Sequence, residues 1–221
     1  MNLKIKSNSP TKVKPPVRIT RDVRRQQTLE ALRQSAMHEF ALNGVAGTSA
    51  ERIAEAAGFS RGAFYANFEN KQALLLTLIG ERMAEEQAEW LALTDSALDL
   101  DALLSTLNER AQHFDPDGRW TMIAAETYLY ALRDPVFAEQ YRAYHALTLG
   151  TFTRIVEGLF KRAGKRSPVA LDELCDGFLA MNRSLRLPTA DNATPQPIST
   201  ELLITLIRGL IAIAPDAEVS A

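Results

Sequence analysis

The residues whose types and spacing point to a definite chemistry lie in one short segment, Thr48–Asn67. The pattern predicts a helix, a tight turn at Gly58 and a second short helix capped by Ser60. Phe59 is expected to fill the corner of the turn. This is helix-turn-helix spacing, in which the second helix enters a groove of duplex DNA and hydrogen-bonds to base edges. An ordinary helical hairpin inside a core is the alternative, and it would leave the polar face described next unexplained.

The second helix of this segment offers small and polar residues once Phe64 and Phe68, four positions apart, are turned into the core. Small residues let the backbone approach base edges, so Ala63 is expected at a thymine methyl and Arg61 at a guanine. Hydroxyl groups and cations near helix N-termini suit phosphate, as at Thr48, Tyr65 and Lys71. The predicted DNA-binding residues are Thr48, Ser49, Ser60, Arg61, Gly62, Ala63, Tyr65, Asn67 and Lys71.

Charge is divided unevenly along the chain. Residues 1–71 hold twelve Lys and Arg against six Asp and Glu, whereas the other 150 residues hold thirteen against twenty-one. A basic end joined to an acidic body suits a protein that meets a polyanion at one end. Residues 1–20 combine three prolines with five basic residues and no acid, which predicts a flexible basic arm. The arm is either a solvated tail or a DNA contact through Lys12, Lys14 and Arg18.

Helical signals run almost continuously from Asp22 onward, and no segment has the alternating pattern of a strand. We therefore predict an all-α fold of about nine helices. Thr48 and Glu51 have capping-box spacing, which places a helix start at Thr48. The predicted helices span residues 22–42, 48–58, 60–67, 70–93, 99–114, 119–133, 134–162, 167–187 and 199–214.

The stretch from Thr48 to Leu74 resembles the signature of the TetR family of transcriptional regulators. The matching features are the turn Ile53-Ala54 to Ala57-Gly58-x-Ser60, the recognition helix Gly62-x-Phe64-Tyr65-x-x-Phe68, and the helix start Asn70-Lys71-x-x-Leu74. Two positions depart from the family pattern. Phe64 stands where leucine is more frequent, and it fills the same core position. Asn67 stands where many relatives carry histidine or tyrosine.

The resemblance implies a sequence-specific DNA-binding transcriptional regulator with an N-terminal three-helix helix-turn-helix domain and a C-terminal helical ligand-binding and dimerisation domain. We expect the first at residues 21–70, the second at 71–214, and a tail at 215–221. The resemblance further implies a cytoplasmic repressor that a small, largely apolar effector releases from a palindromic operator in double-stranded DNA. Effector binding is expected to act by moving the helix at 70–93.

The helix predicted at 199–214 is apolar around most of its circumference, so it must be buried on two sides. The resemblance implies that the last two helices pair with their copies in a homodimer, while a monomer that buries this helix centrally is the alternative. The predicted interface residues are Leu171, Leu174, Phe178, Leu185, Leu203, Ile207 and Leu210.

Aromatic residues are concentrated between residues 90 and 152, where the resemblance places an effector pocket. Aromatic side chains at helical spacing are otherwise ordinary core residues, and that interpretation stays open at each position. The predicted effector-binding residues are Trp90, Phe114, Trp120, Ile123, Thr127, Tyr128, Tyr144 and His145.

The residues for catalysis or metal binding are few. His38, His113 and His145 are far apart in sequence, and Cys175, the single cysteine, is expected to be a buried apolar residue. No phosphate-binding glycine loop or nucleophile elbow is present, and no apolar run reaches the ~18 residues of a membrane span. We expect no enzyme activity, cofactor, metal or membrane contact. A small helical enzyme and a ligand-independent architectural DNA-binding protein are the alternative functions.

Overall fold

The computed structural model describes residues 20–186, 196–197 and 199–217. The predicted basic arm with Lys12, Lys14 and Arg18, most of the loop before the last helix, and the end of the tail lie outside these ranges. The described residues form nine helices and one pair of two-residue strands, which confirms the predicted all-α class. The elements are α1 (Arg21–Gly47), α2 (Ala50–Ala56), α3 (Arg61–Tyr65), α4 (Lys71–Thr94), α5 (Leu100–Phe114), α6 (Arg119–Ala131), α7 (Pro135–Arg162), α8 (Leu171–Arg183), β1 (Leu185–Arg186), β2 (Gln196–Pro197) and α9 (Thr200–Ile213).

Side-chain caps fix where several helices begin. Ser60 accepts a hydrogen bond from the Ala63 amide, and Asn70 accepts one from the Ala73 amide at 2.8 Å, so both predicted caps are confirmed. The predicted capping box at Thr48 is wrong, because Ser49 caps α2 instead. The Thr48 hydroxyl is turned back into α1.

Two helix boundaries differ from those that the sequence predicted. Gly44 has φ of 70°, which breaks α1 where the sequence predicted its end, although one further turn continues to Gly47. The helix predicted to begin at Ser167 begins instead at Leu171. The preceding segment pairs with the chain beyond α9, since the Arg166 amide donates to the Pro215 carbonyl at 3.0 Å. That pairing holds the backbone extended and delays the helix.

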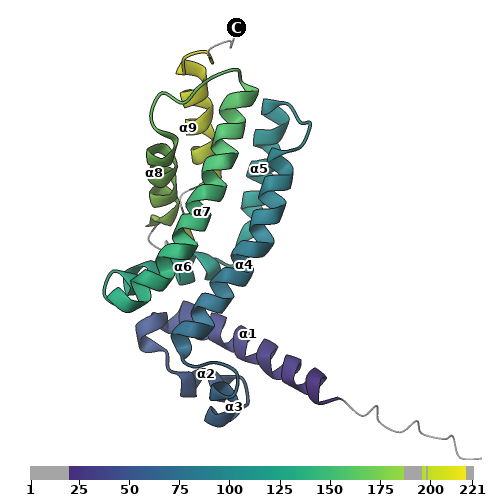
Figure 1. The fold of residues 1–221 in the computed structure, drawn as a ribbon, viewed down its shortest axis with the longest axis vertical. Helices are drawn as coiled ribbons and strands as arrows, with labels where there is room; N and C mark the ends of the chain where they lie inside the picture. Colours follow the sequence, from purple (N-terminus) through teal and green to yellow (C-terminus); the bar gives the residue numbers. More distant parts are fainter. Residues whose placement is uncertain (1–19, 187–195, 198, 218–221) are drawn as a thin grey trace, which may run out of the picture.

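The helices form a small lower end and a long body (Figure 1). We call α1–α3 the head and α4–α9 the body. Figure 1 shows α2 and α3 at the lower end of the molecule, α8 and α9 at the upper end, and α4 running from the head into the body. Because α4 continues into the head and α6 packs along α1, a movement of α4 or α6 within the body would shift the helices of the head.

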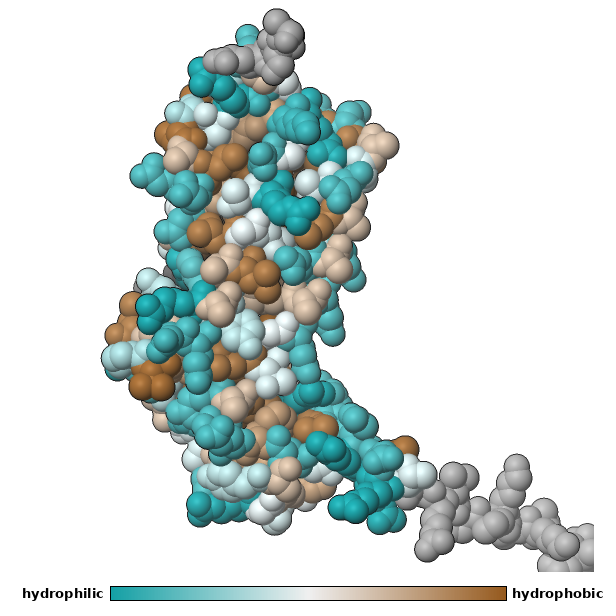
Figure 2. Space-filling view, viewed as in Figure 1, coloured by the Kyte–Doolittle hydropathy of each residue, from teal (hydrophilic) through white to brown (hydrophobic). Residues whose placement is uncertain are grey.

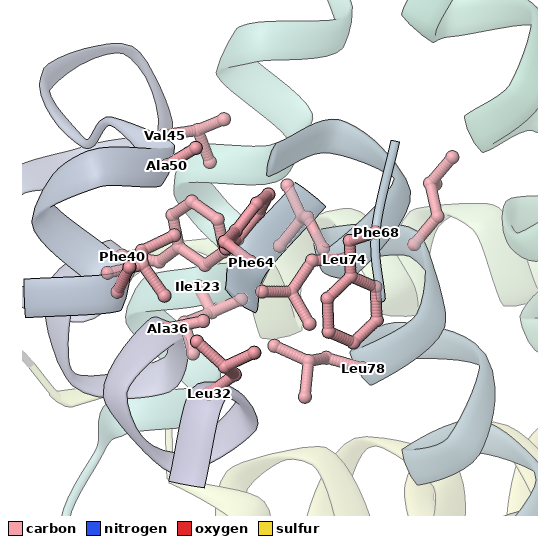
Figure 3. Close-up of a cluster of buried hydrophobic side chains, with 14 of the residues drawn as sticks. Leu32, Ala36, Phe40, Val45, Ala50, Phe64, Phe68, Leu74, Leu78 and Ile123 are labelled. Carbon is pink, nitrogen blue, oxygen red and sulfur yellow. The ribbon is translucent and has the colours of Figure 1, made fainter. Parts of the chain in front are cut away.

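The buried side chains form two hydrophobic clusters. The first joins the head to the lower body, since Phe40, Phe64 and Leu74 pack with Ile123 of α6 (Figure 3). The second lies at the far end of the body and includes Leu104, Val156 and Cys175. Cys175 is fully buried, as its sequence context predicted. The predicted boundary between residues 70 and 71 thus divides one continuous core.

None of the helices in the described part of the chain is long and apolar enough to cross a membrane.

Candidate nucleic-acid interface

The short helix α3 is held from behind by two phenylalanines. Phe64 is fully buried and Phe68 is 9% exposed, with their ring centroids 5.8 Å apart. Both belong to the cluster that contains Phe40 of α1, and Figure 3 shows these rings beside Leu74 of α4. The predicted inward orientation of the two rings is confirmed. Burial of two aromatic side chains fixes α3 as a rigid element, which DNA recognition requires.

The turn between α2 and α3 is closed by its backbone. Gly58 takes φ of 76°, the left-handed conformation that the sequence predicted. The Phe59 amide then donates to the Ala54 carbonyl at 2.8 Å. The Phe59 side chain is 36% exposed, so it covers the corner of the turn only in part.

The outer face of α3 is small and accessible. Gly62 and Ala66 are exposed, Ala63 is half-buried, and Tyr65 is 45% exposed. The Arg61 side chain is 69% exposed, and its Nε lies 3.0 Å from a carboxylate oxygen of Glu51 on α2. An exposed ion pair of this kind contributes only ~0–1 kcal/mol, so Arg61 can be released to a base edge at little cost.

Arg61 also lies over the ring of Tyr65, with its guanidinium carbon 5.3 Å from the ring centroid. Asn67 is turned inward, since its Nδ2 donates to the Ala63 carbonyl at 2.8 Å. The exposed guanidinium of Arg61 thus lies between a carboxylate of α2 and an aromatic ring of α3.

Two of the predicted DNA contacts have internal partners. The Thr48 side chain is buried, and its hydroxyl donates to the carbonyls of Glu39 at 3.0 Å and Gly44 at 2.8 Å. The Lys71 ammonium donates to the carbonyls of Val45 and Thr48, each at 2.6 Å. Burial also lowers the pKa of the Lys71 ammonium. Lys71 thereby joins α4 to the end of α1, and Thr48 closes that end of α1. The sequence could not show either contact, because the partners are backbone carbonyls.

A shallow cleft of about 350 Å³ opens beside α3 at the start of α4. Ser49, Tyr65 and Asn70 are exposed residues on its wall, and Lys71 lies beneath. The first turn of a helix has amide groups without intrahelical partners, and these favour an anion. The cleft has the chemistry of a phosphate contact site next to the recognition helix.

The predicted effector-binding residues are distributed over both hydrophobic clusters and the surface of the body. Ile123 and Thr127 are fully buried, Trp120 and Tyr144 pack against the first cluster, and Tyr128 is 37% exposed. Trp90 packs against the second cluster. His145 lies 3.1 Å from a guanidinium nitrogen of Arg183.

Phe114 is the member of that set that lines a cleft, one of about 490 Å³ between α4 and α5. Its wall also carries charged side chains, which the sequence prediction did not include. The lining residues are Arg82, Glu86, Leu93, Thr106, Glu109, Arg110, His113 and Phe114.

The predicted dimer residues lie mainly on the inner faces of α8 and α9. Phe178 and Ile207 are 6% and 5% exposed within the protomer, and Leu171, Leu174, Leu203 and Leu210 pack against the same second cluster. Leu185 lies in β1 opposite Pro197. The large apolar residues that α9 leaves exposed are Leu202, Leu206 and Ile213.

Several residues that shape the head and the cleft were missed from the sequence. Glu51 pairs with Arg61, and its only signal in the sequence was its place three residues after Thr48. Gln72 donates to the Tyr130 hydroxyl at 2.9 Å and so ties α4 to α6. Arg82 and Arg110 of the cleft lie among charged residues in the sequence, a pattern typical of a helix face exposed to solvent. Such pairings link distant positions and leave no local pattern.

Comparison with known proteins agrees with this geometry. Residues 32–78 match the model of the bacterial regulatory proteins of the tetR family. The fold is similar to that of a TetR-family regulator from Mesorhizobium loti MAFF303099, at 18% identity over 86% of this chain and 95% of that one, with a TM-score of 0.59. It is also similar to Salmonella enterica GusR, at 21% identity over 88% and 98% of the chains, with a TM-score of 0.61.

A third similar structure is a SmeT–triclosan complex, at 21% identity over 70% of this chain and 76% of that one, with a TM-score of 0.54. No curated protein sequence matches the chain. At these identities the structural likenesses show the fold.

A helix-turn-helix head with an exposed, rigidly anchored second helix, joined to a helical body, defines a DNA-binding regulator. The family match covers the residues that build this head, from Leu32 of α1 to Leu78 of α4. This part of the chain matches the tetR family of bacterial regulatory proteins, and the chain as a whole shares the fold of solved TetR-family structures.

Proposed function

We propose that this chain is a homodimeric repressor that leaves a palindromic operator when a small, largely apolar effector binds in its body. The observation that carries the proposal is the exposed face of α3, anchored from behind by Phe64 and Phe68. We assign DNA binding to residues 21–70, and effector binding and dimerisation to residues 71–214. We also assign the protein to the cytoplasm, because its proposed target is bacterial DNA.

The contacts to DNA divide into base-reading and positioning groups. Arg61 is exposed and weakly paired, so it reads a base edge, while Gly62 and Ala63 let the backbone come close. Ser49, Ser60 and Tyr65 have accessible hydroxyl groups that suit phosphates. Thr48 and Lys71 support this surface from inside rather than contacting DNA directly.

The homodimer is supported by the exposed stripe of α9, which consists of Leu202, Leu206 and Ile213. These residues recur at helical spacing on the side opposite the protomer core, and Gly209 between them is also exposed. A stripe of large apolar residues on a well-packed helix is the usual mark of an isologous interface. Two heads held by such a dimer would meet half-sites one DNA turn apart.

The coupling between effector and operator is supported by contacts that tie the head to α4 and α6. A Cβ on Gly44 would lie 2.5 Å from the Glu126 carboxylate, so α6 presses closely on the end of α1. Arg33 of α1 pairs with Glu81 of α4. An effector that shifts α4 or α6 would change the spacing of the two heads and favour the unbound state.

That an effector exists is supported by the cleft between α4 and α5 and by a relative of the same fold, since the SmeT structure is a complex with triclosan. The volume of about 490 Å³ lies within the range of small-molecule sites.

The test begins with selection of bound duplexes from a random pool by the full chain at low salt. We expect enrichment of a palindrome, and Arg61→Ala should relax the preference at one position in each half-site, costing ~1–3 kcal/mol there. Arg154→Ala, an exposed site on α7, is the matched control and should leave the preference intact. Absence of any enriched sequence would refute the proposal.

A further inference from the structure

The cleft between α4 and α5 contains two arginines whose bonding is incomplete. Arg82 donates through Nη2 to the Phe114 carbonyl at 2.7 Å, and Arg110 pairs through Nη2 with Glu89 at the cleft edge. The Nε atoms of both residues are shielded from solvent and have no acceptor among the described residues. Each guanidinium thus holds donors that the folded protein leaves unused, which is a costly state for a buried group.

The carboxylate at the centre of the cleft is fully engaged. Glu86 lies 3.1 Å from Arg82 and 3.9 Å from Arg110, and it accepts a hydrogen bond from the Trp90 indole at 2.9 Å. Its side chain is only 17% exposed. At its centre, the cleft therefore has spare hydrogen-bond donors and, among the described residues, no spare acceptor. Because the Nε atoms are shielded, an acceptor from outside reaches the two guanidinium groups by displacing Glu86.

The aromatic faces that could take a cationic ligand are already covered. The Arg82 guanidinium lies 4.3 Å from the centroid of Phe114, and that of Arg110 lies 5.3 Å from Trp90. A ligand cation would have to displace a protein cation from either ring. Among the lining residues, Glu86 and Glu109 offset the charges of Arg82 and Arg110, so an anion of more than one charge would also be disfavoured.

We infer that the effector carries a single carboxylate, which binds between Arg82 and Arg110, attached to an apolar body that packs along Leu93 and Phe114. The inference rests on the proposed function and names the chemical class of its effector. The planar, forked guanidinium matches a carboxylate better than any other side chain does. A carboxylate bound there competes with Glu86 for Arg82, which also lies 5.7 Å from the Trp120 ring of α6. Arg82 thereby connects the cleft to α6, the helix that packs against the end of α1.

The test uses matched probes and the full chain without DNA. The acids are 3-phenylpropionate, 4-phenylbutyrate and indole-3-acetate, and each is compared by titration calorimetry with its primary amide and its corresponding amine. We expect at least one acid to bind about tenfold or more tightly than its amide and its amine, the usual effect of a charged hydrogen-bond pair. Inorganic phosphate should not compete.

The variants decide where the acid binds. Arg110→Gln should remove the preference for the acid while leaving binding of the amide, and Arg154→Gln should leave both. If Arg110→Gln lacks the helical circular dichroism of the parent chain, Arg82→Lys takes its place, since it keeps the charge and loses the fork. The inference is wrong if no acid exceeds its amide, or if the folded variant keeps the preference. DNA binding is measured in a separate experiment. Failure of the carboxylate inference therefore leaves operator recognition intact, and failure of operator recognition leaves the carboxylate inference intact.

Discussion

The head and the body use arginine in opposite ways. In the head, Arg61 is 69% exposed and is held by an exposed carboxylate, so its donors are available to DNA. In the body, Arg82 is 25% exposed, donates to a main-chain carbonyl and covers an aromatic ring. A guanidinium on the surface is positioned for a large partner that removes its water, whereas one in a cleft selects a small partner by shape and charge.

The largest expected effect is the loss of the support behind α3. Phe64→Ala should lower the free energy of unfolding by ~3–5 kcal/mol, because it empties a fully buried aromatic site. Urea denaturation followed by circular dichroism measures the change. Phe59→Ala is the control and should cost less than ~1 kcal/mol, because that ring is already partly exposed. Equal losses of unfolding free energy in the two variants would contradict the claim that Phe64, and not Phe59, anchors α3.

The next effect concerns the part of the body that pairs the heads. Leu206→Glu should convert the dimer to a monomer in sedimentation velocity, because a charge would stand in the exposed stripe of α9. Operator affinity should fall by about 100-fold, since the two half-sites lose their linkage. Leu132→Glu, at an exposed apolar position after α6, is the control and should remain dimeric. Figure 2 shows apolar side chains around that turn as well, so a monomeric Leu132→Glu would move the interface there.

A smaller effect separates internal support from DNA contact at the border of head and body. Lys71→Met keeps the apolar stem and removes the ammonium that binds the Val45 and Thr48 carbonyls. The free energy of unfolding should fall by ~1–3 kcal/mol. The slope of log affinity against log salt should stay constant, whereas loss of a phosphate contact would flatten it by about 0.9. Lys161→Met, exposed at the end of α7, controls for the removal of one charge.

The smallest expected effect tests whether the ion pair between Arg61 and Glu51 is weak. Glu51→Gln removes its carboxylate partner, and stability should change by less than ~1 kcal/mol. Affinity for the selected operator should rise about two- to fivefold. Arg61 would no longer have to break an ion pair in order to bind DNA, and one negative charge near the DNA would be removed. Fluorescence anisotropy measures the change. A strong loss of binding would mean that Glu51 positions Arg61 rather than restrains it.

The sequence predicted the head better than the body, and the reason is physical. The features of the head are local: Ser60 caps the next residue's helix, Gly58 turns the chain, and Phe64 and Phe68 share one face. The error at Thr48 came from a competing long-range partner, because its hydroxyl binds the Glu39 and Gly44 carbonyls instead of capping α2.

The site in the body depends on contacts between residues far apart in sequence. Arg82 meets the Phe114 carbonyl 32 positions away, and no spacing in the sequence marks that pair. On α9, which is apolar on nearly every side, composition could not show that Ile207 faces the protomer core and Leu206 faces outward. Only the packed structure distinguishes these faces.

The most direct test of the central claim is amide hydrogen exchange of the full chain with and without its selected duplex. Recognition through α3 predicts slower exchange across residues 60–67 and the first turn of α4, with no change in α8. Protection that is absent from residues 60–67, or confined to the body, would contradict the account.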